Sequence, residues 1–276
     1  MAQVFGLVFK TSLAFLVAFS SAWVSARSLS DLDAVDQASL QRTLSMRIAK
    51  AYIQMAANVD YQKAETELDH SIVEFEYSLN QLEMNSPNSK LHQRIKQVQS
   101  EWLSFRSIAE TTPNVAQVED LIEEANDLLY QTDALVREWK MRLLGEHGMQ
   151  MDLASQQSML SERIGAFYVA GYLGLKEDWM AQELEQSISA YEQGMISLRG
   201  QEDVHPSLMA QLNSNGEYAK MGLSQFKNDH YVPVVIAVTM ESMYEQTNTL
   251  GAAYHVQERL AMNGGVAKGL AANMAE

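Results

Sequence analysis

Two arginines, Arg42 and Arg47, give this sequence its clearest opportunity for binding chemistry. They lie in the segment ASLQRTLSMRIAKAY (38–52), and a similar segment, ASQQSMLSERIGAFY, occupies 154–168. A guanidinium group offers several N–H donors in one plane, and hydroxyl groups beside it add further donors, a combination suited to a small anion. The candidate ligand-binding residues of the two segments are Arg42, Ser45, Arg47, Ser158, Ser161 and Arg163.

Two pairs with the spacing Glu-x-x-His, Glu67/His70 and Glu202/His205, raise the alternative of a metal site. A di-iron helical bundle needs two such pairs in the middle of facing helices. The second pair stands beside Pro206, in a predicted connection, so the spacing does not support a metal site. The chain also lacks cysteine and the zinc, phosphate-loop and serine-elbow motifs of common enzymes. We therefore expect neither catalysis nor a bound cofactor.

The two arginine segments belong to an internal repeat with an offset of 116 residues. Nine of the seventeen positions in 36–52 are identical to their counterparts in 152–168. The same offset persists farther along the chain, where Glu67 recurs as Glu183. Self-similarity in register over this length indicates a duplicated structural unit. The sequence predicts two copies of one module, 30–146 and 147–262, followed by a flexible tail at 263–276.

Turn-forming residues divide each module into four helices. Asn58 and Gly174 hold equivalent positions, and both residue types readily adopt the left-handed conformation that ends a helix. The four prolines lie between predicted helices, where proline can start a helix without losing an internal hydrogen bond. The predicted helices are 31–57, 60–84, 89–110, 114–143, 149–173, 177–199, 206–227 and 233–262. Short connections make successive helices antiparallel, so the expected fold is all-α, with two tandem up-down-up-down four-helix bundles.

The junction between the modules contains Gly145 and Gly148. These glycines would permit a hairpin that sets the two bundles side by side. A nearly continuous helix through the junction would instead stack the bundles end to end. The sequence leaves both arrangements open, with a slight preference for end to end.

A helical wheel of the first segment places an apolar stripe along Leu44 and Ile48, which predicts the face turned toward the core. Arg47, like Arg163 in the second copy, lies at the edge of this stripe. There its aliphatic stem could pack on the core while its charged head reaches water or a carboxylate. The preferred interpretation is that the head reaches water. Arg42 points away from its own bundle, so its side chain is expected to be solvated unless a partner covers it.

The N-terminal segment 1–26 has the pattern of an export signal. Lys10 precedes an apolar run from about Leu13 to Val24, and Val24-Ser25-Ala26 supplies the small residues that a signal peptidase needs. An uncleaved inner-membrane anchor is the alternative interpretation. The formal net charge of −15 makes nucleic acid a poor partner. We therefore expect a soluble periplasmic protein that binds no nucleic acid.

The segment 38–52 resembles the signature of the PilJ-type domain, the N-terminal sensor domain of type IV pilus methyl-accepting chemotaxis transducers. That signature runs approximately A-G-R-Q-R-M-L-S-Q-R-M-A-K-A-Y. It is related to the first-helix motif of NarX-type nitrate/nitrite sensor kinases, whose sensor is also a four-helix bundle. The resemblance extends over both modules, but its specific part is this short segment, which occurs twice.

The resemblance assigns roles to individual arginines. The last arginine of the signature is kept as Arg47 and Arg163, whereas the central one is kept as Arg42 but replaced by Ser158 in the second copy. The first arginine is lost to Leu40 in the first copy. In the nitrate sensors the central arginine, supplied by two first helices across a subunit interface, holds the anion. Because Ser158 is neutral, the resemblance implies a homodimer that pairs Arg42 with Arg42 rather than a clamp within one chain.

Two functions remain open on this basis. The first is a periplasmic sensor-type protein that binds a small ligand, such as a nitrate-like anion, and signals through a membrane chemoreceptor or sensor kinase. The second is a structural or adaptor protein that keeps the bundle but has lost ligand binding. The retained Arg42 favours the first function, and the loss of its counterpart at Ser158 favours the second.

Overall fold

The computed structural model describes residues 29–143, 148–199, 206–224 and 230–273, which contain α-helices, one short 3-10 helix and no strand. The predicted all-α fold is confirmed, whereas the predicted export signal at 1–26 lies outside the described residues. The helices are α1 (Asp31–Ala56), α2 (Tyr61–Met84), α3 (Ser89–Ala109), η1 (Val115–Gln117), α4 (Val118–Lys140), α5 (Met149–Tyr172), α6 (Asp178–Arg199), α7 (Pro206–Ser224) and α8 (Pro233–Asn273). We call α1–α4 the first module and α5–α8 the second module.

The first helix of each module ends in the same way. Asn58 has φ 53° and Gly174 has φ 91°, the left-handed conformation predicted for both. The following residues close the helix with matching backbone bonds: the amide of Val59 donates to Gln54 and that of Leu175 to Ala170, at 2.8 and 3.2 Å. This paired arrangement satisfies carbonyl groups at the helix end that would otherwise lack a donor.

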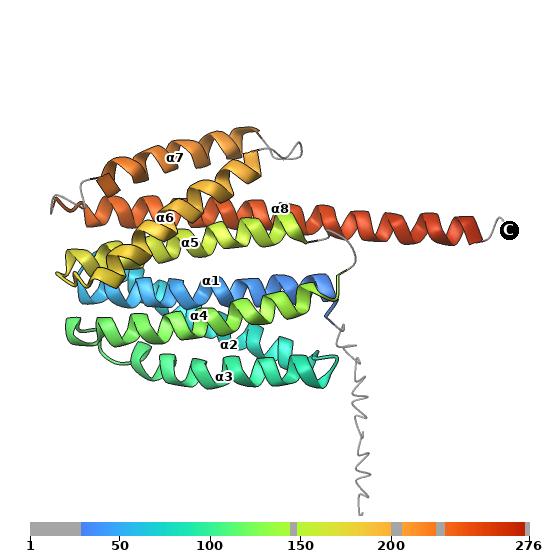
Figure 1. The fold of residues 1–276 in the computed structure, drawn as a ribbon, viewed down its shortest axis with the longest axis horizontal. Helices are drawn as coiled ribbons and strands as arrows, with labels where there is room; N and C mark the ends of the chain where they lie inside the picture. Colours follow the sequence, from blue (N-terminus) through green and yellow to red (C-terminus); the bar gives the residue numbers. More distant parts are fainter. Residues whose placement is uncertain (1–28, 144–147, 200–205, 225–229, 274–276) are drawn as a thin grey trace, which may run out of the picture.

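The last helix continues beyond its predicted end. Gly264, Gly265 and Gly269 predicted that the helix ends at residue 262, yet α8 runs as a helix to Asn273. Glycine lowers helix stability by only about 1 kcal/mol relative to alanine, and no proline interrupts this alanine-containing stretch. Figure 1 shows the last part of α8 projecting past the ends of the other helices.

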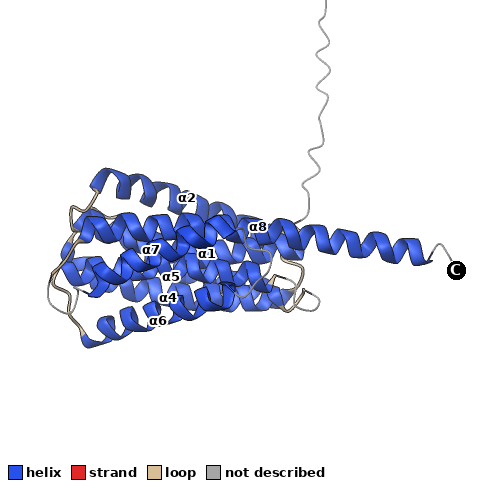
Figure 2. Ribbon diagram, turned by 90° about the horizontal axis from the view of Figure 1, so that it is seen from above, coloured by secondary structure: helices blue, strands red, loops and turns tan. Residues whose placement is uncertain are grey.

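Helices α1 and α5 lie at the centre of the molecule. Helix α1 packs against α2, α4 and α5, while α5 packs against α6, α8 and α1. Figure 1 shows the two modules side by side along their length, and in Figure 2, which is seen from above, their helices overlap. The preference for an end-to-end arrangement was therefore wrong. Gly148, with φ 76°, starts α5 in a left-handed conformation, so the chain turns back beside α1 instead of continuing the direction of α4.

Helices α1 and α5 run parallel, with equivalent residues facing each other. The hydroxyl of Ser155 donates to the carbonyl oxygen of Ser39, its counterpart in the repeat, at 3.3 Å. One turn farther along α1, the Thr43 hydroxyl donates to the Ser155 carbonyl oxygen at 3.5 Å. Small hydroxyl side chains allow two helix backbones to approach closely. This α1–α5 seam is the main contact between the modules.

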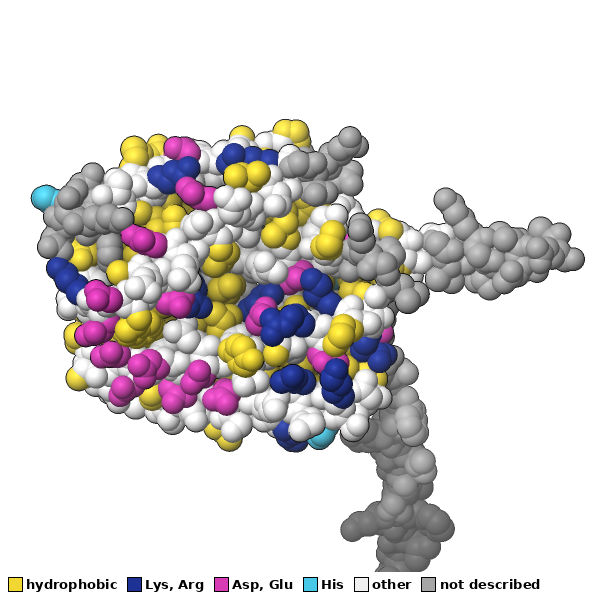
Figure 3. All heavy atoms as spheres, viewed as in Figure 1, with side chains coloured by type: hydrophobic (Ala, Val, Ile, Leu, Met, Phe, Trp, Pro, Cys, Tyr) yellow, Lys and Arg dark blue, Asp and Glu magenta, His cyan; other side chains and the backbone are white. Residues whose placement is uncertain are grey.

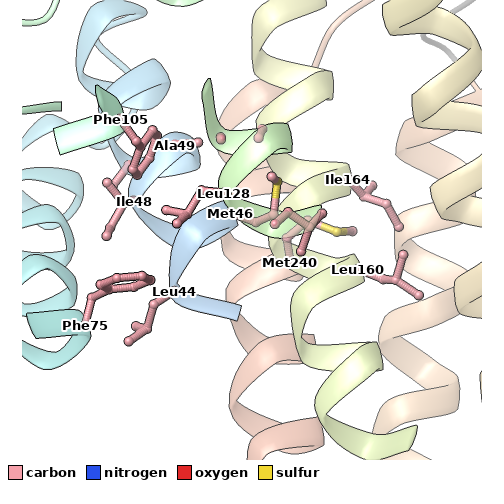
Figure 4. Close-up of a cluster of buried hydrophobic side chains, with 14 of the residues drawn as sticks. Leu44, Met46, Ile48, Ala49, Phe75, Phe105, Leu128, Leu160, Ile164 and Met240 are labelled. Carbon is pink, nitrogen blue, oxygen red and sulfur yellow. The ribbon is translucent and has the colours of Figure 1, made fainter. Parts of the chain in front are cut away.

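The predicted apolar stripe forms the core of each module. Leu44 and Ile48 are fully buried in the first module, as Ile164 is nearly so in the second. Figure 4 shows Leu44 and Ile48 together with the aromatic rings of the first module, and Ile164 beside Met240 of α8. The stripes of α1 and α5 thus face opposite ways, and the remaining faces of the two helices are left to meet at the seam.

Candidate functional site

Arg42 lies in the α1–α5 seam and is 1% exposed. Its Nη2 donates to Oδ1 of Asp152 at 2.8 Å and to the Asp152 carbonyl oxygen at 3.3 Å. Its Nη1 donates to Oδ1 of Asp133, on α4, at 3.2 Å. The direction away from its own bundle was predicted correctly, but the expected solvation was wrong because α5 covers this face. A homodimer that pairs Arg42 with Arg42 would require this buried side chain to leave both aspartates.

The three candidate serines use their hydroxyls within their own helices or modules. The Ser45 hydroxyl donates to the carbonyl oxygen of Arg42, and the Ser161 hydroxyl donates to that of Ser158, each at 2.8 Å. Ser158 itself donates to Ala154 and lies 2.8 Å from the hydroxyl of Thr247 on α8. All three serines are buried. The structure therefore brings Arg42 and Ser45 close together but directs no serine hydroxyl toward the Arg42 guanidinium.

Arg47 belongs to a second group of charges, also at the α1–α5 seam. Its guanidinium lies 2.6 Å from Oε1 of Glu162, which is fully buried on α5. It also forms two hydrogen bonds with the carboxylate of Glu241 on α8, at 2.8 and 3.0 Å. The ring of Tyr244 covers the guanidinium at 4.1 Å from its centroid. The interpretation of Arg47 as an edge residue with its head in water was wrong, because only 11% of the side chain is exposed.

Lys50 completes this group and was not identified from the sequence. It is 1% exposed, and its ammonium lies 2.7 Å from Glu162, 2.9 Å from Glu241 and 3.3 Å from Glu67 of α2. Two signals in the sequence could have identified it: Lys50 matches the lysine of the PilJ-type signature, and the two copies differ at this position. Lys50 corresponds to Ala166, and Glu162 corresponds to Met46. We call the group of Arg47, Lys50, Glu67, Glu162 and Glu241 the seam charge cluster.

The seam charge cluster contains two cations and three carboxylates. Burial alone would raise the pKa of Glu241, but Lys50 and Arg47 beside it lower that pKa to about 2. Burial raises the pKa of Glu67, and this effect exceeds the opposing influence of Lys50 and Arg47. Burial opposes the charge of Lys50, yet Glu162 and Glu67 raise the pKa of its ammonium. Of Glu67 and Glu241, Glu67 is therefore the carboxyl that takes up a proton more readily.

Arg163 is the counterpart of Arg47 but has a simpler environment. Its Nη2 lies 2.6 Å from Oε2 of Glu183, which is itself the counterpart of Glu67. Glu183 is 36% exposed, so this pair reaches water. Burial lowers the pKa of Arg163, and the attraction of Glu183 offsets this only in part. An Arg–Glu contact occurs at equivalent positions of both modules, Arg47–Glu67 at 3.7 Å and Arg163–Glu183 at 2.6 Å. The further charges of Lys50, Glu162 and Glu241 lie only around Arg47.

A shallow groove of about 490 Å³ opens on the surface beside Arg42, between α4, α5 and α6. Asn126, Tyr130 and Asp133 of α4 line one side, and Gln156 of α5 lines the other. Figure 3 shows hydrophobic side chains on this face together with both positive and negative groups. Because carboxylates already hold the guanidinium, the groove presents no surplus of positive charge to an anion.

The part of the chain that the structure covers holds no group of three or more His, Asp or Glu side chains placed to bind a metal ion. Glu67, from one of the two Glu-x-x-His pairs, takes part in the seam charge cluster instead. The second pair, at 202–205, lies outside the described residues. None of the helices in the described ranges is long and apolar enough to span a membrane.

Comparison with known protein families agrees with the resemblance noted for the arginine segment of α1. The sequence model of the family described as "Type IV pili methyl-accepting chemotaxis transducer N-term" matches residues 23–136, which include α1 to most of α4. No curated protein and no solved structure matches the chain significantly. The family description names the N-terminal part of a chemotaxis transducer. The match covers less than half of the chain, so the comparison shows that the sequence of residues 23–136 is similar to a PilJ-type domain.

Proposed function

We propose that this protein is a periplasmic sensory accessory that acts on a membrane chemoreceptor by direct contact. The observation that carries the proposal is the PilJ-type domain at 23–136, since domains of this type belong to chemotaxis transducers. We further propose that the second module is a diverged copy of the same domain, supported by the sequence repeat and by the equivalent residues that meet at the α1–α5 seam.

The projecting end of α8 is the proposed contact with the receptor. Leu260 is 66% exposed and Val256 is 57% exposed, and both lie in the C-terminal half of α8, whose last part extends past the other helices (Figure 1). Exposed apolar side chains on a single helix are typical of surfaces that pack against a partner helix. Arg259 and His255 on the same part of α8 both contact Asp33 of α1, so a partner bound to this end could alter the packing of α8 on α1.

A photo-crosslinking amino acid placed at Leu260 is expected to join the protein to a membrane chemoreceptor in the native cell. The same amino acid at Val73, an equally exposed position on α2, serves as the matched control and should give no such product. Mass spectrometry of the crosslinked band identifies the partner. The same products from both positions, or a Leu260 product without any receptor, would contradict the proposal.

The second candidate function is anion sensing at Arg42. Two observations favour it. The arginine of the family signature is kept as Arg42, and Nε of Arg42 has no hydrogen-bond partner within the described ranges. Against it, Asp133 and Asp152 already balance the charge of the guanidinium. An anion entering the site would have to displace a buried aspartate that is also bound by Lys140 at 2.5 Å.

Nitrate, nitrite and chloride at matched ionic strength are expected to change the melting temperature of the protein equally, since the aspartates occupy the site. A ligand that binds only the folded state at a hundredfold excess over Kd adds about 2.7 kcal/mol. That would raise Tm by roughly 5–10 °C in a protein of this size. A rise of this size with nitrate or nitrite alone, absent in Arg42→Ala, would restore anion sensing as the function.

A further inference from the structure

The second module contains a cavity of about 190 Å³ lined by residues of all four of its helices. Most of its lining is apolar, with Ile164, Ile188, Leu212 and Met243 as examples. A second hollow of about 420 Å³, between the ends of α6 and α7, shares Ile188 with the first and therefore adjoins it. Figure 1 shows α6 running obliquely past α7 on this side of the module.

The corresponding region of the first module is filled by aromatic rings. Trp102 of α3 stacks on Phe75 of α2, with ring centroids 4.1 Å apart and an interplanar angle of 17°. Phe105, one turn along α3, is also fully buried. Stacked rings of this kind exclude water and bury a large apolar area. The space between α2 and α3 is closed by these side chains.

The second module lacks the ring that corresponds to Trp102. Buried residues of α7 follow the same spacing as those of α3, displaced by one residue from the 116-residue repeat, so Leu212, Ala219 and Gly222 match Ile95, Trp102 and Phe105. Ala219 lines the cavity, and a methyl group there replaces an indole ring. The residue that matches Phe75 by the repeat is Tyr191, which also lines the cavity. The cavity thus lies where the first module places a tryptophan side chain.

Tyr191 presents a hydroxyl that no part of the described chain satisfies. Its side chain is 6% exposed, and Oη has no hydrogen-bond partner among the described residues. Oδ1 of Asn213, another residue lining the cavity, is likewise without a partner. Burial raises the pKa of Tyr191, so its phenol stays neutral. A buried polar group without a partner destabilises a protein by about 1–3 kcal/mol, which a bound molecule with a matching group would recover.

We propose that this cavity binds a small neutral aromatic molecule that carries an N–H or O–H donor. The ring would occupy the space that corresponds to Trp102 of the first module, and the donor would bond to Tyr191 Oη. An apolar cavity of roughly 150 Å³ is large enough for benzene, so about 190 Å³ accommodates a slightly larger ring system.

Charges at the edge of the cavity favour a neutral ligand. Lys220 lies 3.2 Å from Glu192 and 3.4 Å from Glu217, and Arg199 is the fourth charged residue of the lining. Two cations and two carboxylates balance one another, so the entrance selects neither sign of charge. This site goes beyond the proposed function and does not depend on a receptor, since its ligand can be tested on the purified protein.

Isothermal calorimetry with indole and benzofuran tests the proposal, because the two molecules share a shape but only indole carries an N–H donor. Wild-type protein is expected to bind both with saturable heat, and indole more tightly. Tyr191→Phe introduces the residue that the first module has at this position. It should weaken the affinity for indole roughly fivefold, because one neutral hydrogen bond is lost, and leave the affinity for benzofuran unchanged.

Ala219→Trp should abolish the binding of both molecules by filling the cavity. Tyr218→Trp, a change at the neighbouring exposed position, is the matched control and should leave binding intact. Absence of saturable indole binding to the wild type, or equal affinity for indole and benzofuran, would overturn the proposal. The Tyr191→Phe comparison keeps the test decisive if Ala219→Trp does not fold.

Discussion

Replacing Arg47 by methionine is expected to lower the free energy of unfolding by about 3–5 kcal/mol. Removing one partner from a buried ion pair leaves the other charge without compensation, a loss of that order. Here the group left behind includes Glu162, which is fully buried and lies 2.6 Å from the guanidinium. Methionine keeps the apolar stem of Arg47, so the loss reports the charged contacts rather than packing.

Arg163→Met is the matched control, because the two arginines hold the same position in the repeat. Its partner Glu183 reaches water and can be solvated after the change, so the expected loss is about 1 kcal/mol or less. Urea denaturation of both variants at pH 7 measures the difference. Equal losses for the two variants would show that the carboxylates around Arg47 are hydrated when it is removed, against the buried seam charge cluster described above.

Lys50→Met is expected to have a comparable effect, about 3–5 kcal/mol at pH 7, with a characteristic pH dependence. The change leaves Arg47 alone with three carboxylates. The folded variant then holds a proton on Glu67, whose pKa burial already raises, more tightly than the unfolded chain does. A raised folded-state pKa makes stability increase as the pH falls through it toward the unfolded value of 4.5.

The wild type should gain less stability than the variant over this range, because Lys50 opposes the protonation of Glu67, whose pKa burial raises. Lys50 and Arg47 overcome the effect of burial and lower the pKa of Glu241 to about 2, so its contribution is complete above 4.5 and is lost as the pH falls toward 2. The difference in the free energy of unfolding between wild type and Lys50→Met should therefore become smaller from pH 7 to about pH 4.5. Lys63→Met, which removes a half-exposed lysine 3.8 Å from the same Glu67, should cost less than about 1 kcal/mol. A gap between wild type and Lys50→Met that stays constant with pH would argue against protonation of Glu67.

The sequence was sufficient to predict the helices but not the contact between the two modules. Helix ends at Asn58 and Gly174 follow from local backbone preferences, and the stripe through Leu44 follows from the period of the α-helix. These signals act within one helix, so a single sequence reveals them. The boundary of α8 was misjudged because glycines weaken a helix without terminating it.

The seam between α1 and α5 could not be predicted because its buried residues are polar. Arg42, Lys50 and Glu162 are each at most 1% exposed, yet charged side chains in a helical pattern normally indicate a solvated face. Their burial depends on partners that are more than 90 residues away in the chain, such as Asp152 for Arg42 and Glu241 for Lys50. Hydrophobic periodicity carries no information about such pairs. Comparison of the two copies does, since Lys50 and Glu162 stand where the other copy has Ala166 and Met46.

The parallel α1–α5 seam joins two parts of one chain rather than two separate chains. Tethering makes the association intramolecular, so the seam persists at any dilution, and a melting temperature should not vary with protein concentration. In a two-fold symmetric dimer every substitution appears on both sides of the axis. A fused pair is free of that constraint, so a lysine on one side can meet a glutamate on the other without placing two like charges across the axis. The two modules are therefore complementary rather than interchangeable. If two chains exchanged their second modules, each α1 would again meet an α5, and the contact would again join unlike residues.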